Sequence, residues 1–559
     1  MRLVPLLTLL LATSVAAQTA PTPGACTTGT AEATITPGRV EASVFNTGAL
    51  FFGNRLTNGD GYIVPRGSGT SPIFSATLWL AGTVGGELRA VAPRYTNFAF
   101  WPGPLGSGGT APADCAAYDR IYRVTRADVA AYVAGSAPTA DLRDWPATLG
   151  APVLDGDGVA GTYNLAGGDQ PALRGDEVAW WLINDVGNVH QDLYLTPGSP
   201  PFGVEARVEA YGFDAPPLDE TTFYRYTLTN RTAHPIDSVY AGFYVDADLG
   251  DASDDYIGSD TLTGLSFTYN ADNNDGGSVG YGVAPPAIGV QVTRGPVGLP
   301  NGRDDDRDGA TDEPGEPLFT TAAPLVYKSG TSATYGEPGT AEAVLRRLRG
   351  LWGDGTPVRA FGDGYGEMQG SVTRYAYPGD PVSGQAWSEV NNGSASPVNP
   401  PSDRRMLVST GPFRLAPGAS ETVTFAFPYA RGSSNLDSVT RLRALANGIR
   451  SLFTDGDLEP VRIGAGSLIP VSQAVRLSRP FPNPTSGRAT VTYEMPTGTR
   501  LRATLHDVLG RELAVLADGP TAASTGELTI DGARLAPGVY RVRVVVPAGE
   551  QMLQFVVTR

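Results

Sequence analysis

Residues 489–495 read ATVTYEM, and this short run near the C-terminus decides the fold class. Ala489, Val491, Tyr493 and Met495 place apolar side chains on one face, while polar residues alternate with them. A period of two residues predicts a half-buried β-strand. The pattern recurs at Leu501–Leu505, Tyr540–Val546 and Leu553–Val557. Short alternating strands separated by glycines predict a small antiparallel β-sandwich at the end of the chain.

Three motifs occur in order along this tail. They are Pro482-Asn483-Pro484 with Gly487, then Val508-Leu509-Gly510-Arg511-Glu512, then Leu535-Ala536-Pro537-Gly538-Val539-Tyr540. Together they resemble the type A C-terminal sorting domain of the type IX secretion system of Bacteroidota. The resemblance implies recognition by the outer-membrane translocon and its sortase-like machinery, with cleavage and then release or attachment to surface lipopolysaccharide. Family members commonly end on a lysine-rich strand, and this tail does not, so the motifs favour export over retention.

The N-terminus has the pattern of a secretory signal peptide. Arg2 supplies the positive charge, Leu3–Ala12 the apolar segment, and Val15-Ala16-Ala17 the small residues before a cleavage site. The apolar run is too short to span a bilayer, and no later run reaches the roughly 20 residues required, so we expect no transmembrane span. The predicted organisation is a signal peptide over 1–17, a passenger over 18–470 and the sorting domain over 471–559.

Composition fits a β-rich exported protein. The 559 residues include 70 Gly and 46 Pro, which provide turns between many short strands. The formal net charge of -16 argues against nucleic acid and anionic membranes as partners, because both require a basic surface.

Within the passenger, strand patterns outnumber helical ones. We expect strands at Phe74–Leu80, Val204–Phe213, Phe223–Leu228, Val239–Val245, Leu262–Tyr269 and Thr422–Phe427. We expect helices at Ala127–Ala134 after Thr125, at Ala341–Arg349 after Thr340, and at Leu436–Phe453 with one apolar stripe. The fold class is therefore mainly β, with a large sandwich-like passenger, either one body or two fused sandwiches, and a few short helices.

Several passages of the passenger resemble a family of uncharacterised secreted proteins of Bacteroidota that carry the same tail. They are residues 100–105, 175–181, 246–260 and 353–366. The resemblance supports the domain layout and implies no activity.

The chain has two cysteines, Cys26 and Cys115. In an exported protein such a pair favours a disulfide over two free thiols. The bridge would close a loop of roughly 90 residues and contribute about 4 kcal/mol, mainly by restricting the unfolded chain.

The first candidate metal loop follows Asn301-Gly302-Arg303. Asp304, Asp306, Asp308 and Asp312 place carboxylates at alternating positions, and Gly309 permits a sharp turn. The pattern resembles the calcium loops of EF-hand, dockerin and thrombospondin type 3 repeats, since hard cations require several oxygen ligands from one loop. Gly315 stands where an EF-hand has its bidentate Glu. We expect a structural calcium site here, the alternative being a solvated acidic loop.

A second acidic cluster follows the predicted strand Val239–Val245. Asp246, Asp248 and Asp251 lead it, and Asp254, Asp255 and Asp260 come later in the same stretch. Clustered carboxylates repel one another unless a cation or arginines compensate them. Calcium is the natural cation, although loop aspartates also serve as turn formers.

Catalytic patterns are weaker. His190 and His234 belong to no metal-ligand pair such as H-E-x-x-H, which argues against a zinc hydrolase. Gly276–Gly280 reads GGSVG and Gly156–Gly161 fits a dinucleotide fingerprint in spacing, but neither leads into a helix. A glycosidase needs only two suitably separated carboxylates, and Trp180-Trp181, Trp101, Trp352 and Trp387 could stack on sugars or lie in the core.

These patterns predict a secreted or outer-surface protein exported by type IX secretion. Its passenger is expected to be a calcium-stabilised, non-enzymatic module for interaction, adhesion or structure, with extracellular glycan or surface lipopolysaccharide as possible partners. The alternative is a secreted polysaccharide-active hydrolase, which would show a tryptophan-lined groove with two carboxylates about 5–10 Å apart.

Overall fold

The structure is a computed structural model. It describes residues 26–52, 61–95, 99–187, 190, 195–305, 311–326, 332–366, 368, 370–392, 399–453, 458, 476–478, 480–495, 500–507, 511–521, 525–546 and 549–558. The predicted signal peptide lies outside these residues.

One nine-stranded sheet, the first sheet, runs in the order β1-β2-β3-β5-β14-β23-β20, with β4 beside β2 and β6 beside β5. Its strands are β1 (Glu32–Ile35), β2 (Glu41–Phe45), β3 (Ala49–Leu50), β4 (Tyr62–Ile63), β5 (Ser75–Val84), β6 (Glu87–Val91), β14 (Ile236–Asp246), β20 (Leu325–Val326) and β23 (Arg405–Leu415). The pairings within it are antiparallel, and β14 lies between β5 and β23.

A second nine-stranded sheet, the second sheet, runs in the order β15-β16-β19-β24-β13-β12-β11-β7, with β8 beside β11. Its strands are β7 (Trp101–Pro102), β8 (Tyr122–Thr125), β11 (Glu177–Asn184), β12 (Val204–Gly212), β13 (Thr221–Asn230), β15 (Asp255–Asp260), β16 (Leu265–Asn270), β19 (Ala287–Arg294) and β24 (Ser420–Ala430). Three two-stranded ribbons complete the passenger: β9 (Val153–Leu154) with β10 (Gln170–Pro171), β17 (Asn274–Asp275) with β18 (Gly282–Val283), and β21 (Val358–Arg359) with β22 (Val372–Thr373).

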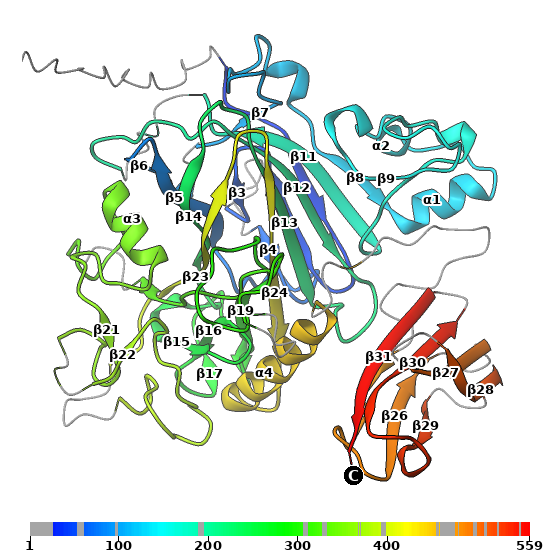
Figure 1. Cartoon of the computed structure of the whole chain (residues 1–559). Coiled ribbons are helices and arrows are strands. Elements are labelled where there is room, and N and C mark those ends of the chain that lie inside the picture. The colour runs from blue at the N-terminus through cyan, green and yellow to red at the C-terminus, as the bar shows by residue number, and fades with distance from the viewer. Residues whose placement is uncertain are drawn as a thin grey trace, which may run out of the picture.

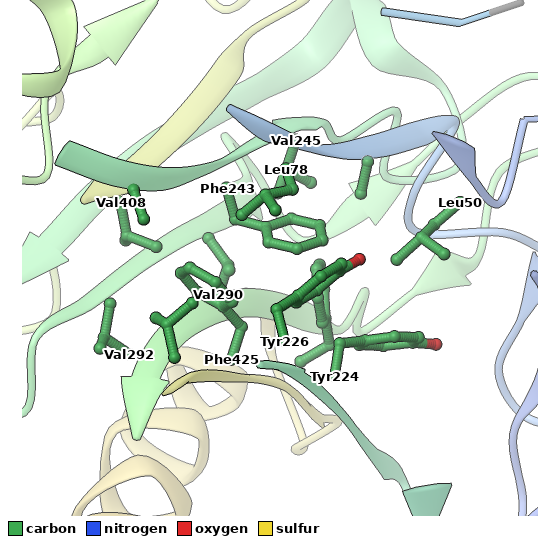
Figure 2. Close-up of a cluster of buried hydrophobic side chains, with 14 of the residues drawn as sticks. Leu50, Leu78, Tyr224, Tyr226, Phe243, Val245, Val290, Val292, Val408 and Phe425 are labelled. Atoms are coloured by element: carbon green, nitrogen blue, oxygen red, sulfur yellow. The ribbon is translucent and has the colours of Figure 1, made fainter. Parts of the chain in front are cut away.

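The two sheets face each other across one hydrophobic core. Figure 2 shows Phe243 and Val408 of the first sheet pointing toward Tyr226 and Phe425 of the second, and the rings of Phe243 and Phe425 lie 4.8 Å apart. These side chains belong to one continuous cluster of buried residues that draws on both sheets. The passenger is therefore built around one sandwich, where the sequence left open two fused ones.

Both faces of the second sheet are covered, which explains why β11 is apolar at nearly every position. Trp181 points into the core between the sheets, whereas its neighbour Trp180 points to the outer face. On that outer face lie α1 (Arg126–Val133) and α2 (Ala140–Arg143) at one end and α4 (Asn435–Leu452) across β16, β19 and β24. Helix α3 (Ala341–Leu348) covers the outer face of the first sheet (Figure 1).

The three helices predicted from sequence are present, with ends shifted by about one residue. Thr125, Thr340 and Ser434 are the N-cap residues of α1, α3 and α4, each accepting a backbone N–H with its side chain. At Thr125 the capping box with Asp128 is complete. The six predicted strands all fall within β5, β12, β13, β14, β16 and β24 or overlap them.

The C-terminal unit has two small antiparallel sheets. One contains β25 (Arg476–Leu477), β26 (Arg488–Glu494) and β29 (Thr525–Asp531); the other contains β27 (Arg500–Asp507), β28 (Glu512–Pro520), β30 (Gly538–Val546) and β31 (Gly549–Val557). The alternating residues Ala489, Val491 and Met495 point into a core made only of residues from this unit. The small sandwich predicted for the tail is confirmed.

Candidate metal centre

The acidic residues at the end of β14 form a group with a residue far away in the chain. Carboxylate oxygens of Asp246, Asp248 and Asp403 all lie within 4.8 Å of one another. The pairing of β14 with β23 explains the group, because Asp246 is opposite Arg405 in the antiparallel register. Asp248 lies two residues after Asp246, and Asp403 lies two residues before Arg405. Because the strands are antiparallel, both residues lie beyond the same end of this strand pair. We call these three residues the acidic trio.

Two arginines neutralise part of the charge around the trio. Arg405 contacts Asp246 at 3.0 Å, Asp403 at 2.5 Å and Glu337 at 3.0 Å. Arg94 pairs with Glu337 at 2.5 Å. The two guanidinium groups thus contact three carboxylates, those of Asp246, Asp403 and Glu337.

Asp246 is the most strongly perturbed member of the trio. It is 2% exposed, and burial raises its pKa to about 8, with Asp248 and Asp403 adding to the rise and Arg405 opposing it. Its Oδ2 accepts a hydrogen bond from the Tyr95 hydroxyl at 2.7 Å, whereas its buried Oδ1 has no hydrogen-bond partner among the described residues. A buried oxygen of this kind is costly unless a ligand or a proton satisfies it.

Glu337 behaves in the opposite way. Burial acts to raise its pKa, but Arg94, the Tyr244 hydroxyl and Arg405 outweigh burial and hold the pKa below its ordinary value. Glu337 therefore remains ionised between the two arginines and serves as their counter-ion.

Asp251, the third residue expected in this cluster, lies apart from the trio. Its carboxylate accepts the backbone N–H of Ser253 at 3.0 Å, which lowers its pKa, and its own N–H donates to Asp275 at 3.0 Å. It serves as a turn former, which was the alternative reading for aspartates in this stretch. Asp403 takes its place in the group, and no local motif at Asp403 pointed to it.

Part of the loop that follows Asn301 lies outside the described residues, including Asp306 and Asp308. Of the other two candidates, Asp312 accepts N–H groups from Asn301 at 2.6 Å and Gly302 at 2.8 Å, so its carboxylate joins the two ends of the loop. Asp304 precedes Asp305, whose backbone N–H donates to Glu316. A cation in this loop stays a prediction.

A second acidic group, which the sequence analysis did not select, consists of Asp155, Asp157 and Asp169. Asp169 already accepts the N–H groups of Gly156 at 2.8 Å and Asn164 at 2.7 Å. Asp157 accepts from Val159 and Asn164. These carboxylates hold the 155–169 loop closed, and Gly156–Gly161, which fits a dinucleotide fingerprint in spacing, lies in this loop.

The structure also shows where the GGSVG residues and the tryptophans lie. Residues 276–281, with the GGSVG pattern, form the turn between β17 and β18 and not a strand-turn-helix. All seven tryptophans are described and each is 5% exposed or less, which places Trp101, Trp180, Trp181, Trp352 and Trp387 in the core. None of them presents a ring to solvent for stacking on a sugar.

The two cysteines are joined. Cys26 and Cys115 form a disulfide with their Cα atoms 5.4 Å apart. The bridge connects the segment before β1 to the segment before β8, and Asp119 adds a second link by accepting the N–H groups of Thr30 and Ala31 at 2.8 Å.

Among the residues expected to carry the sorting signal, Asn483 connects the two ends of the C-terminal unit. Asn483, between Pro482 and Pro484, accepts the N–H of Val556 in the last strand at 2.8 Å. Gly538 begins β30 opposite Val557, and the Tyr540 hydroxyl donates to the carbonyl of Ala536 at 2.8 Å. Gly487 lies just before β26, where its N–H donates to Thr485. Gly510 lies outside the described residues.

Comparison with known proteins identifies the tail. Residues 479–558 match the family model described as the secretion system C-terminal sorting domain. No curated protein sequence matches the chain. Among the described residues, no helix is long and apolar enough to cross a membrane.

Two solved structures illustrate the remaining similarity. A polysaccharide lyase is 10% identical over 63% of this chain and 34% of its own, with a TM-score of 0.19. PorZ, a surface component of the type IX secretion system of Porphyromonas gingivalis, is 12% identical over 65% of this chain and 46% of its own, with a TM-score of 0.12. The chain thus spans less than half the length of either protein, and TM-scores this low carry no argument.

Proposed function

This chain carries a type IX secretion sorting domain and is exported to the cell surface or secreted, and from that premise we propose that its passenger is a calcium-stabilised, non-enzymatic module for interaction or structure. The sorting domain implies interaction with the type IX machinery. Cleavage by its sortase-like component, and contact with surface lipopolysaccharide or extracellular glycan, belong to the proposal.

The acidic trio is the observation that supports calcium. It provides carboxylate oxygens within 4.8 Å of one another and a buried oxygen of Asp246 that has no hydrogen-bond partner among the described residues. Calcium prefers six to eight oxygen ligands in flexible geometry, which suits carboxylates on a loop. Because Asp246 is 2% exposed, a cation here would stabilise the fold instead of bridging to an external ligand.

The buried tryptophans support a non-enzymatic module over the hydrolase. Carbohydrate-active sites commonly present aromatic rings to sugars, and here all seven tryptophan side chains are buried. Interaction with a glycan would therefore rely on polar surface loops.

Thermal unfolding of the full mature chain, in calcium and in chelator, tests the calcium assignment. Calcium at 100 times its Kd would add about 2.7 kcal/mol to the free energy of unfolding. We expect Asp403→Asn to reduce the stabilisation, and Asp251→Asn, the matched control from the same acidic stretch, to retain it. Asp306→Ala tests the loop after Asn301 separately. If Asp403→Asn and the unmodified chain gain equally from calcium, the trio does not bind it.

A glycan array probed in calcium and in chelator tests the interaction role. Calcium-dependent binding to one class of glycan would identify an adhesin or lectin. Release of shorter oligosaccharides from the bound glycan would instead favour the hydrolase. The absence of glycan binding in both calcium and chelator would favour a structural surface protein.

A further inference from the structure

The C-terminal unit exposes a phenylalanine ring at its start. Phe481 is 79% exposed, although the smaller side chain before it, that of Pro480, is buried. Pro482 and Pro484 are exposed as well, so three apolar residues lie at the surface within one short stretch of chain. Phenylalanine is among the residue types most often buried, which makes its exposure here informative. We call residues 481–485 the Phe481 loop.

Hydrogen bonds fix the backbone of this loop at both ends. Phe481 exchanges two backbone hydrogen bonds with Thr490 of β26, each 2.9 Å long. At the other end, the N–H of Thr485 donates to the carbonyl of Val556 in β31 at 2.9 Å, and the side chain of Asn483 accepts the N–H of Val556. The loop is therefore attached to a strand of each sheet of the unit.

The ring of Phe481 contributes little to the folding of the unit itself. The buried cluster of this unit is made of other residues, and the exposed ring lies outside it. An aromatic side chain that enters a pocket on a partner can supply a large share of the binding energy of an interface. Because the backbone beneath the ring is already fixed, a partner would not need to order the loop on binding.

The family match and the chemistry of the loop indicate the kind of partner. The match to the secretion system C-terminal sorting domain covers residues 479–558 and so includes the whole loop. An anionic partner such as lipopolysaccharide would require basic side chains, and the segment from Pro480 to Thr485 contains no charged residue. A protruding apolar ring between prolines instead fits an apolar pocket on a protein.

We propose that Phe481 is the anchor by which the sorting unit docks into an apolar pocket on a component of the type IX machinery. Asn483 and Thr485 are positioning residues, which hold the loop against β31 so that the ring faces outward. The inference is independent of the calcium proposal for the passenger. It rests on the interaction between the sorting domain and the type IX machinery, and it assigns one contact residue to that interaction.

Export of the full chain from a bacterium that has a type IX system tests the proposal. Immunoblots give the ratio of chain at the surface and in the medium to chain left in the periplasm. We expect Phe481→Ala to lower this ratio at least about 10-fold, as loss of an interface anchor does for binding. Phe481→Leu keeps a large apolar side chain and should retain more export. Val515→Ala is the matched control, since Val515 is an apolar residue of β28 that is 50% exposed.

Thermal unfolding of the purified full chain separates a contact residue from a structural one. Phe481→Ala should leave the melting temperature of the sorting unit unchanged, because the ring is exposed. Asn483→Ala should lower it by roughly 4–8 °C, because the hydrogen bond to Val556 is lost. Normal export of Phe481→Ala would overturn the proposal. A melting temperature lowered as much as in Asn483→Ala would also overturn it, because Phe481 would then be a structural residue.

Photocrosslinking identifies what the ring contacts. Benzoylphenylalanine placed at position 481 of the full chain, and activated in the same bacterium, should form an adduct with a type IX component, identified by mass spectrometry. An adduct with the passenger, with a second copy of the chain or with lipopolysaccharide would overturn the proposal. A chain that ends at residue 470 tests the premise separately: if it is still exported, the tail is not the export signal and the proposal fails with it.

Discussion

At the scale of single residues, the passenger relies on charges that are buried in pairs. Glu389 and Arg404 are both 0% exposed and meet at 3.1 Å, and Glu389 also accepts the N–H of Ile257 in β15 at 2.6 Å. Burial raises the pKa of Glu389, although Arg404 and the hydrogen bond from Ile257 oppose the rise. The pair holds the segment before β23 against the edge strand of the second sheet.

Removal of the arginine should therefore be costly. We expect Arg404→Met to lower the free energy of unfolding by about 3–5 kcal/mol at pH 8, because it leaves an uncompensated buried carboxylate. Arg414→Met is the control, since Arg414 and Asp237 form an exposed pair worth little. Chemical denaturation measures both. Losses of equal size in the two variants would contradict the role assigned to the buried pair.

The pH dependence of this variant follows from the direction of the pKa shift. A carboxyl group whose folded pKa is raised binds a proton more readily when folded, so its unfavourable contribution grows as pH rises through that pKa and vanishes below the unfolded value. Without Arg404 the pKa of Glu389 should rise further. The cost of Arg404→Met should consequently be smaller at pH 5 than at pH 8, and Glu389→Gln in the same chain should recover part of the loss at pH 8.

At the scale of elements, α4 shows how the passenger seals the second sheet. Its stripe of Val439, Leu442, Ala446 and Ile449 is buried, as the helical periodicity predicts. Leu452, which continues the same stripe, is 48% exposed, because it stands in the last turn of the helix. Periodicity assigned the face correctly and overestimated how far the contact extends.

We expect Leu442→Ala to destabilise the passenger by about 2–5 kcal/mol, since it opens a cavity under the helix. Leu452→Ala, the same change ten residues along the helix, should stay within about 0.5 kcal/mol. Denaturant unfolding monitored by tryptophan fluorescence compares the two. A small effect at Leu442 would mean that α4 contributes little to the core on the outer face.

At the scale of the whole molecule, the chain has two kinds of core. The buried clusters of the sandwich and its covering helices contain only residues before 459, whereas the cluster of the C-terminal unit contains only residues after 476. A domain with its own core can fold by itself. The predicted boundary near residue 470 falls between these clusters.

Calorimetry of the full chain should accordingly show two transitions. The sorting unit should contribute an unfolding enthalpy on the order of 60 kcal/mol, in proportion to its length. A chain that ends at residue 470, without the sorting unit, should lack that transition and keep the passenger's melting temperature unchanged. A single transition that moves to lower temperature on truncation would show that the two units are energetically coupled.

Much of the architecture could be predicted because its signals are local. Alternation located β12, β13, β14 and β24, caps located α1 and α3, and an apolar stripe located α4. Short ordered motifs located the sorting domain before its family match. The candidate site could be predicted only in part. Asp246 and Asp248 follow a strand visibly, but Asp403 is separated from Asp248 by more than 150 residues, so no local pattern connects them.

The sequence by itself determined the fold class, the main elements and the export route, because the two-residue period of a strand, the chemistry of a helix cap and the motifs of the tail each lie within a few neighbouring residues. Only the tertiary structure decided which acids meet and which aromatic rings are exposed. Strand pairing places Asp403 near Asp246 and Asp248, and the two sheets, together with the helices and loops that cover their outer faces, bury all seven tryptophans. Proximity across a sheet depends on register, which long-range contacts specify.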